Sequence, residues 1–189
     1  MVTTVEGDPK PASAAVREPV GKGWFSIRET MSVPADSIPV LLVHDKSPDA
    51  STMLLGELQR AGRMAIAVCP RTPGLTQQPR FTGAIISEVI NITGLKPSVD
   101  VIAHGQQAGL AVVEAALKHP DYFRGVVFMG TKVDTLNGAI ERGRHRLDSA
   151  MVLEPRQNTI FGDSRQILRA LDDLDFLVEI RGRMIQSTP

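Results

Sequence analysis

The sequence predicts a single α/β domain, built on a mostly parallel six-stranded sheet with helices on both of its faces. Short, wholly apolar runs alternate with segments whose apolar residues recur at helical spacing, about six times between residues 38 and 180. A run that is apolar at every position suits a strand buried on both faces. Strands separated by helices are expected to run parallel, joined by right-handed crossovers.

The same alternation sets the expected domain boundaries. Residues 1–23 are rich in proline, alanine, glycine and charged residues, with isolated valines and no clear period. A segment of this composition buries too little apolar surface to order itself, so we expect a flexible N-terminal arm there. The domain is expected to occupy residues 24–189, a length sufficient for a substantial core.

Six strands and four helices are expected along the domain. The strands are the apolar runs 39–43, 64–68, 99–103, 125–130, 158–161 and 176–180. The helices are the periodic segments near 51–61, 82–93, 108–118 and 167–174. Glycines at positions 62 and 94 supply stops for the first two helices. Residues 131–156 are polar and weakly periodic, so an irregular excursion is expected there.

Composition narrows the kinds of partner. The chain has 21 Lys plus Arg and 21 Asp plus Glu, and this zero net charge does not favour a nucleic acid or an anionic membrane as partner. With Cys69 as the single cysteine, neither an intrachain disulfide nor a cysteine-based metal cluster is expected. No phosphate loop, dinucleotide fingerprint or metal-ligand spacing occurs in the sequence, so we expect no cofactor and no metal. The N-terminus lacks a secretory pattern and no apolar segment is long enough to span a bilayer, so a soluble cytoplasmic protein is expected.

The most informative stretch is residues 99–110, where an apolar run ends in a corner made by His104 and Gly105 and a helical pattern begins at once. A strand, a tight turn and a helix are the context in which a nucleophile is held at the end of a parallel sheet. The position of that nucleophile is Gly105, which has no side chain. Glycine can adopt the unusual backbone angles of such a corner, so we expect the turn to survive without its chemistry.

From about residue 39 to residue 182, the chain resembles a small α/β-hydrolase of the bacterial lipase and esterase kind. Residues 40–44 resemble the strand that leads into that family's His-Gly oxyanion loop, and residues 99–106 resemble its Gly-His-Ser-Gln elbow. Residues 160–164 resemble the strand end that carries the acid of its catalytic triad. The resemblance implies a minimal α/β-hydrolase fold, with site positions at His44, Asp45, His104, Gly105, Gln106 and Asp163.

The departures from this family fall on its chemistry. A serine hydrolase needs an oxygen nucleophile, an imidazole base, a carboxylate that orients the base, and N–H groups for the oxyanion. Gly105 stands in place of the nucleophile, and residues 181–185 contain no histidine where the family carries its base. Asp45 replaces the glycine that follows His44, and a carboxylate there would repel an oxyanion. Gln107 stands where the family has a small residue, so we expect it to crowd the turn.

Two residues keep alternative interpretations. Asp163 occupies the triad-acid position, but it also fits the N-cap of the next helix, and the missing base favours the cap. Cys69 follows a strand and is the alternative nucleophile. A reactive thiolate needs a cationic or basic neighbour, and no motif places a histidine beside Cys69, so a buried, inert thiol is favoured.

The sequence therefore predicts a lipase/esterase-like pseudo-enzyme of the α/β-hydrolase fold, which acts as a binding or structural module. Expected partners are a small apolar ligand in the vestigial cleft, another protein or a second copy, because the predicted domain lacks the family's last helix and leaves apolar sheet surface uncovered. The alternative hypothesis is an active carboxylic-ester hydrolase that uses Cys69 or a serine from residues 131–156. A third is a structural subunit tethered by the N-terminal arm.

Overall fold

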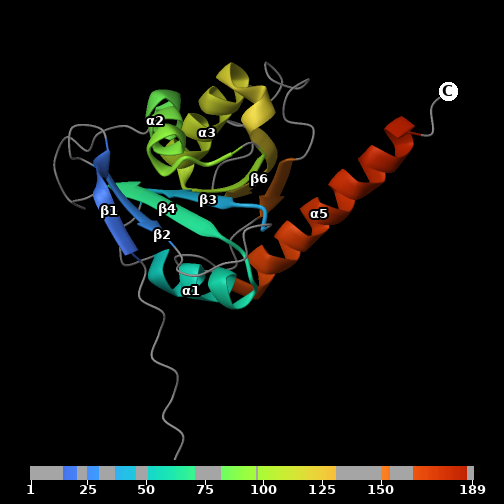
Figure 1. Ribbon diagram of the computed structural model, residues 1–189, viewed down its shortest axis with the longest axis horizontal. Coiled ribbons are helices and arrows are strands. Elements are labelled where there is room, and N and C mark those ends of the chain that lie inside the picture. Colours follow the sequence, from blue (N-terminus) through green and yellow to red (C-terminus); the bar gives the residue numbers. More distant parts are fainter. Residues whose placement is uncertain are drawn as a thin grey trace, which may run out of the picture.

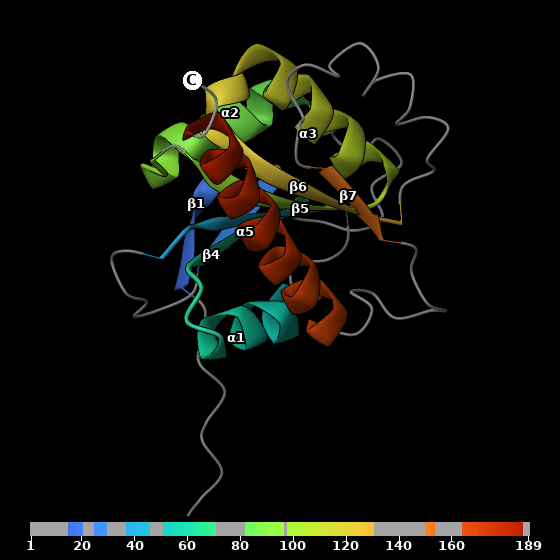
Figure 2. The same ribbon diagram turned by 90° about the vertical axis from the view of Figure 1, so that its right-hand side faces the viewer.

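The computed structural model describes residues 15–20, 25–29, 37–45, 51–70, 82–96, 98–130, 150–153 and 164–186. These residues form one α/β domain with helices on both faces of a central sheet, as Figures 1 and 2 show from two directions. The order of the described strands across the sheet is β1-β2-β4-β3-β5-β6-β7. The predicted α/β class and mostly parallel sheet are confirmed.

Most of the described strands run parallel. The parallel set, in spatial order, is β4 (Ala65–Pro70), β3 (Val40–His44), β5 (Val99–His104), β6 (Phe123–Met129) and β7 (Ala150–Leu153). At the other edge β2 (Phe25–Glu29) pairs antiparallel with both β4 and β1 (Ala15–Val20), so the sheet is mixed. Every position of β3 and β5 is buried, which explains why their sequences are apolar runs without alternation.

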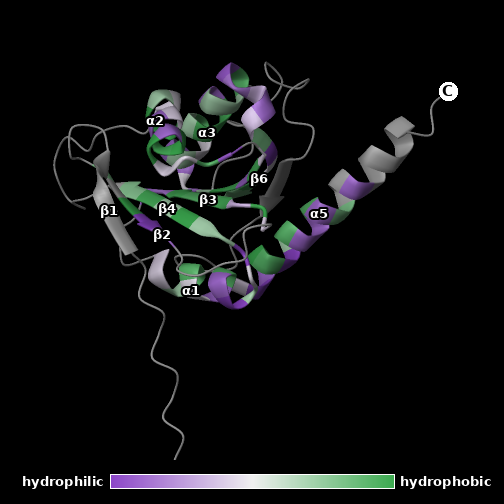
Figure 3. Cartoon of the chain, viewed as in Figure 1, coloured by the Kyte–Doolittle hydropathy of each residue, from purple (hydrophilic) through white to green (hydrophobic). Residues whose placement is uncertain are grey.

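The predicted strands at 39–43, 64–68, 99–103 and 125–130 are confirmed as β3, β4, β5 and β6. Side chains of successive strand residues point to opposite faces of the pleated sheet, so they pack into the two cores on either side of it. Leu41 and Val43 face the core beneath the helices α2 and α3, whereas Val40 and Leu42 face the core beneath α1 and α5. Figure 3 shows hydrophobic residues along β3 and β4 and mixed hydrophobic and hydrophilic residues along α5.

The helices divide between the two faces of the sheet. The helices α2 (Gly83–Thr93) and α3 (Gln106–Lys118) cover one face, and the short 3₁₀ helix η2 (Pro120–Tyr122) follows α3. The helices α1 (Thr52–Arg60) and α5 (Ser164–Gln186) cover the other face (Figure 1). The first three predicted helices are confirmed. In the described segments, no helix has the length and apolar content needed to cross a membrane.

The prediction of a last strand at residues 176–180 is wrong, because these residues belong to α5, a helix of 23 residues. Its buried side chains recur at intervals that place them on one helical face, as expected of a helix packed against a sheet. Among the side chains of α5 that the structure describes, they are Ile167, Ala170, Leu171 and Leu174. The short apolar run after position 175 has the length of a strand, and the helical phase of the preceding residues decides between the two structures.

Three strands lie where none was expected, and with the four confirmed strands they make the seven strands of the described sheet. One of them is β2, at the start of the predicted domain. Residues 15–20 form β1 inside the predicted arm, and residues 150–153 form β7 inside the predicted excursion. The strand β1 contains charged residues and pairs with β2. The strand β7 is apolar at all four positions, but it is short, and it pairs with β6. Residues 1–14 of the predicted arm and the predicted strand at 158–161 lie outside the described residues.

Candidate functional site

The candidate site lies where the carboxyl ends of β3 and β5 meet at one edge of the sheet. The two strands are adjacent and parallel, and His44 pairs with His104 in their register. Asp45 directly follows β3 and Gly105 directly follows β5, so the two residues leave the sheet side by side. His44 is fully buried and His104 nearly so. This edge is where open α/β sheets place their ligands.

Gly105 makes the corner between β5 and α3. Its backbone angles are φ 95° and ψ 162°, a region that is essentially open to glycine alone. The Gly105 N–H donates to the Met129 carbonyl at 2.9 Å, and the Gly105 carbonyl accepts the Gly109 N–H at 3.0 Å. The structure therefore has the strand, tight turn and helix that the sequence indicated, with the corner tied to both β6 and α3.

The side chain of Asp45 fills the space above Gly105. A Cβ added to Gly105 would lie 2.6 Å from the Asp45 Cγ and 2.8 Å from its Oδ1, closer than real contacts allow. The Asp45 Oδ1 atom is shielded from solvent and accepts no hydrogen bond from the described residues, and Gly105 is buried. The position from which an elbow nucleophile would rise is thus occupied by a carboxylate from the neighbouring strand.

The elbow glutamines lie on the surface of α3 rather than in the turn. Gln106 is the first residue of α3 and is half-buried, whereas Gln107 is exposed. The expectation that Gln107 crowds the strand-to-helix turn is wrong, because the first turn of the helix directs this side chain to solvent.

Cys69 lies on β4 with no exposed surface. Val43 of β3 pairs with Val68 of β4, so the residues that follow, His44 and Cys69, are neighbours across the two strands. Val43 and Val68 belong to the core beneath α2 and α3. Successive side chains of a strand alternate between the two faces of the sheet, so His44 and Cys69 lie on the opposite face. No sequence motif indicated this histidine as a neighbour of Cys69, because it depends on the order of the strands.

One expected element of catalysis lies outside the described residues, and the other lies in a helix. Asp163 lies outside the described residues, so its roles as triad acid or helix cap stay predictions. Residues 181–185, which the resemblance placed at a base-bearing loop, belong to the last turns of α5. Within the described parts of the chain, no group of three or more His, Cys, Asp or Glu residues is arranged to hold a metal ion.

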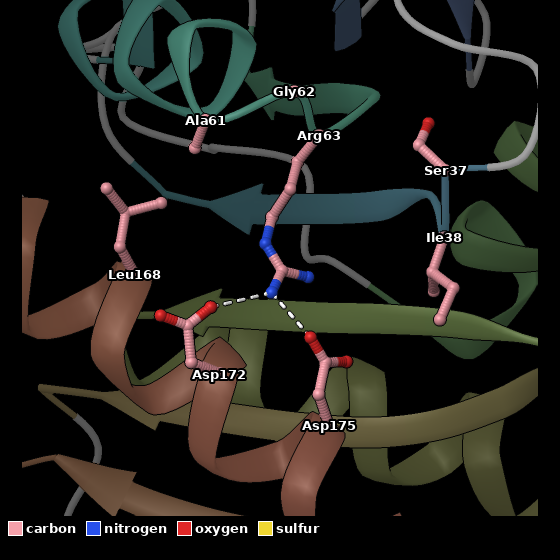
Figure 4. Close-up of a pocket in the computed structure, with 8 residues that line it drawn as sticks. All are labelled: Ser37, Ile38, Ala61, Gly62, Arg63, Leu168, Asp172 and Asp175. Atoms are coloured by element: carbon pink, nitrogen blue, oxygen red, sulfur yellow. Dashed lines mark hydrogen bonds and ion pairs between the residues drawn. The ribbon is translucent and has the colours of Figure 1, made fainter.

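A second group of polar residues lies at the opposite, amino-terminal edge of the sheet, around a pocket of about 480 Å³. Arg63 directs its Nη2 atom between two carboxylates of α5, Asp172 Oδ1 at 2.9 Å and Asp175 Oδ2 at 2.6 Å (Figure 4). Arg124 contacts Asp175 as well, and its Nε donates to Asp100 Oδ1 at 2.9 Å. The five side chains form a chain of alternating charge that joins α5 to β5 and β6.

The pKa values of Asp100 and Asp175, two carboxyl groups of this network, are shifted in opposite directions. Burial raises the pKa of Asp100, in spite of its hydrogen bonds from Arg124. Burial also acts to raise the pKa of Asp175, but hydrogen bonds from Arg124 and Arg63 outweigh it, and the pKa lies below its ordinary value. Arg63 and Arg124 are mostly buried and hydrogen-bonded to carboxylates, so this network attaches a helix to the sheet.

Comparison with known proteins finds partial structural similarity and no family. No family model matches the chain, and no curated protein matches it. Among solved structures, epoxide hydrolase A from Mycobacterium thermoresistibile is 18% identical, with a TM-score of 0.47, over 62% of this chain and 39% of that one. Naproxen esterase from Bacillus subtilis is 15% identical, with a TM-score of 0.46, over 69% and 50%. Carboxylesterase CesB from Bacillus subtilis is 15% identical, with a TM-score of 0.47, over 63% and 44%.

The chain is structurally similar to epoxide hydrolases, lipases and carboxylesterases of the α/β-hydrolase fold. The matched regions span 39% to 50% of the lengths of the three structures compared above. At such low identity the similarity concerns the fold alone, because one fold supports many activities. Function must be argued from the residues of this chain.

Proposed function

We propose that this protein is a non-catalytic α/β-hydrolase-fold module that binds a small apolar ligand or another protein, including a second copy of itself. The observation that carries the proposal is the Asp45 carboxylate in the space above Gly105. An elbow without a side chain has no nucleophile, and here the vacated space is no longer open to a reacting group. The corner therefore lacks a nucleophilic side chain, and the Asp45 carboxylate fills the space that such a side chain would need.

The charge of this occupant also opposes ester hydrolysis. Acyl transfer places negative charge on the substrate oxygen, and hydrolases stabilise it with N–H donors at the elbow. Loss of one such donor typically costs about 3 kcal/mol of transition-state stabilisation. Asp45 brings negative charge to the same corner, so it acts against an oxyanion instead of with it.

The backbone angles of Gly105 do not by themselves oppose a nucleophile, because an elbow serine also sits on a strained strand-to-helix turn. Restoring a nucleophile would need a side chain at position 105, removal of Asp45 and a positioned base.

The decisive experiment measures hydrolysis and labelling together. The wild-type protein is incubated with short p-nitrophenyl esters and with a fluorophosphonate probe, next to an active esterase. We expect neither turnover nor labelling. We also expect the Gly105→Ser variant and the Asp45→Gly/Gly105→Ser variant to be inactive, since the elbow residues alone supply no base. Turnover by the wild-type protein, or labelling at any serine, would overturn the proposal.

Binding is tested on the same esters. A non-catalytic cleft that takes an apolar ligand should raise the unfolding midpoint of the protein in the presence of the ester, with the ester recovered intact. Analytical ultracentrifugation of the free protein at several concentrations tests whether two copies associate. A monomer whose midpoint does not respond to any ester would leave only a different protein as partner.

A cysteine-dependent hydrolase is the second candidate, because Cys69 adjoins His44 across β4 and β3. An imidazole beside a thiol can promote thiolate formation. The absence of any exposed surface on Cys69 opposes this candidate, since a substrate must reach the sulfur atom. Ester turnover that Cys69→Ala abolishes, together with labelling of Cys69 by iodoacetamide in the folded protein, would establish it in place of the first proposal.

A further inference from the structure

The first turn of α3 lacks a cap from its own sequence. The helix has 13 residues, its N-cap residue is Gly105, and no acidic residue occurs in its first turn. The N–H groups at a helix N-terminus carry partial positive charge and need acceptors, which an N-cap side chain or an anion normally provides. Glycine at the N-cap supplies no side-chain acceptor.

The helix α3 cannot expose its first N–H groups to water by moving away from the sheet, because its inner face is buried along most of its length. The buried residues of α3 are Ala108, Gly109, Ala111, Val112, Val113, Ala115 and Ala116. The Gly105 N–H is also committed, to the Met129 carbonyl at 2.9 Å. An acceptor for the first turn must therefore come from another part of the chain.

Asp45 lies where such an acceptor is needed. An aspartate or serine at an N-cap holds its oxygen one or two bonds beyond its own Cβ, and the Asp45 Oδ2 is the atom nearest to the Cβ position of residue 105. The other oxygen, Oδ1, accepts no hydrogen bond from the described residues, so Oδ2 is the oxygen that would cap the first turn. The carboxylate of Asp45 thus occupies the region that a capping side chain on residue 105 would occupy. The parallel pairing of His44 with His104 holds the two residues at this separation.

We infer that Asp45 is an internal anionic plug: its carboxylate caps α3 from the neighbouring strand and closes the elbow to external carboxylates and oxyanions. The inference uses the same contact as the proposed function but does not depend on it, since the plug would exist whether or not the protein has a ligand or a hidden activity. It assigns to one residue both the stability of the α3 N-terminus and the closure of the corner.

The test is chemical rescue by a small anion. Asp45→Ala removes the carboxylate and leaves a space of its size beside the N-terminus of α3. Unfolding midpoints are measured in sodium formate and in sodium chloride at equal ionic strength. We expect the variant to unfold several degrees below the wild-type protein in chloride, and formate at 100 mM to raise its midpoint by roughly 3 °C relative to chloride. Propionate, which is larger, should rescue less.

The matched control is Asp173→Ala, which removes an exposed carboxylate from α5. Formate and chloride should act alike on this variant and on the wild-type protein, whose site is filled. If formate and chloride act alike on Asp45→Ala as well, the plug does not exist. Direct titration with ¹³C-formate, followed by NMR, should show binding to Asp45→Ala and none to the other two proteins.

A second variant keeps the inference testable if Asp45→Ala fails to fold. Asp45→Asn retains an oxygen that can accept from the first turn and fills the same space, so we expect a midpoint close to that of the wild-type protein and no response to formate. An Asp45→Asn protein that loses as much stability as Asp45→Ala would show that capping is not the role of this side chain. Neither outcome depends on ester hydrolysis, so failure of the inference is distinguishable from failure of the proposed function.

Discussion

The carboxylate of Asp45 lies in the space that any side chain on Gly105 would need, although the two residues are 60 positions apart in the chain. The contact arises because β3 and β5 are neighbours in the sheet and end at the same level. The contact makes the two residues depend on each other: the Asp45 side chain leaves room only for glycine at position 105. A side chain at position 105 would meet both a strained backbone and an occupied site.

The first prediction concerns this coupling. Gly105→Ala should destabilise the protein by about 3 kcal/mol, because its Cβ meets the Asp45 side chain in a backbone region that alanine avoids. Gly94→Ala is the control: its φ is 64° and no atom lies within 4 Å of the added Cβ. Backbone strain alone should cost about 1 kcal/mol there. Urea denaturation of both variants measures the difference.

A double variant separates the two contributions at position 105. We expect the loss of unfolding free energy in the Asp45→Gly/Gly105→Ala double variant to be smaller than the sum of the two single losses. The difference should be about 1 kcal/mol or more, because the clash is absent in the double variant. Strictly additive losses would mean that the Asp45 side chain moves aside without cost.

The second prediction tests the packing of α5 on the sheet. Leu174 is fully buried, and its Cδ1 lies 2.9 Å from the Cβ position of Gly125. Leu174→Ala should lower the free energy of unfolding by about 3 kcal/mol through loss of burial and creation of a cavity. Phe176→Ala, at a side chain that is 62% exposed, should cost less than about 1 kcal/mol. Equal losses in the two variants would contradict the helical face described for α5.

The third prediction concerns the close approach of α2 to α3. The Gly83 N–H donates to Glu114 Oε2 at 2.9 Å, and a Cβ on Gly83 would lie 2.9 Å from the backbone nitrogen of Ala115. Backbone atoms cannot turn aside, so Gly83→Ala should destabilise by about 2 kcal/mol. Gly56→Ala, where the nearest atom is 3.9 Å away, should instead stabilise α1 by about 1 kcal/mol. Thermal denaturation of the two variants should shift in opposite directions.

The fourth prediction concerns pH. The pKa of Asp175 is held below its ordinary value, so its ion pairs stabilise the protein above about pH 4 and are lost as pH falls through the folded-state pKa. Asp175→Asn should therefore cost about 1 kcal/mol at pH 7, a figure reduced for solvent screening because this side chain is 40% exposed. The deficit relative to the wild-type protein should shrink as pH falls below 3.8.

The control for this prediction and the role of Asp100 follow from the same linkage. Asp173→Asn, at an exposed carboxylate, should track the wild-type protein at every pH. Asp100 has the opposite sign: because its pKa is raised, its contribution to stability falls as pH rises through its folded-state pKa. A deficit of Asp175→Asn that stays constant from pH 7 to pH 3 would show that the ion pairs with Arg63 and Arg124 do not stabilise the fold.

The sequence alone determined the parallel strands β3 to β6, the helices α1 to α3 and the glycine corner at residue 105, because burial and backbone angles leave local patterns. An apolar run of five residues, or a helical stripe closed by glycine, needs no knowledge of its neighbours. The same approach failed for residues 176–180, where a strand-length apolar run continues a helix, and for the strands β1, β2 and β7. The strands β1 and β2 contain charged residues and are ordered by pairing, whereas the apolar run of β7 is only four residues long and lies between polar segments.

Only the tertiary structure decided what the corner contains. That Asp45 fills the space above Gly105, and that His44 adjoins Cys69, depends on β3 lying between β4 and β5. Strand order is set by the packing of the whole sheet, and no local pattern records which residues from distant strands meet at its edge. The glycine at position 105 could be read from the chain, whereas the side chain that fills the space above it required the fold.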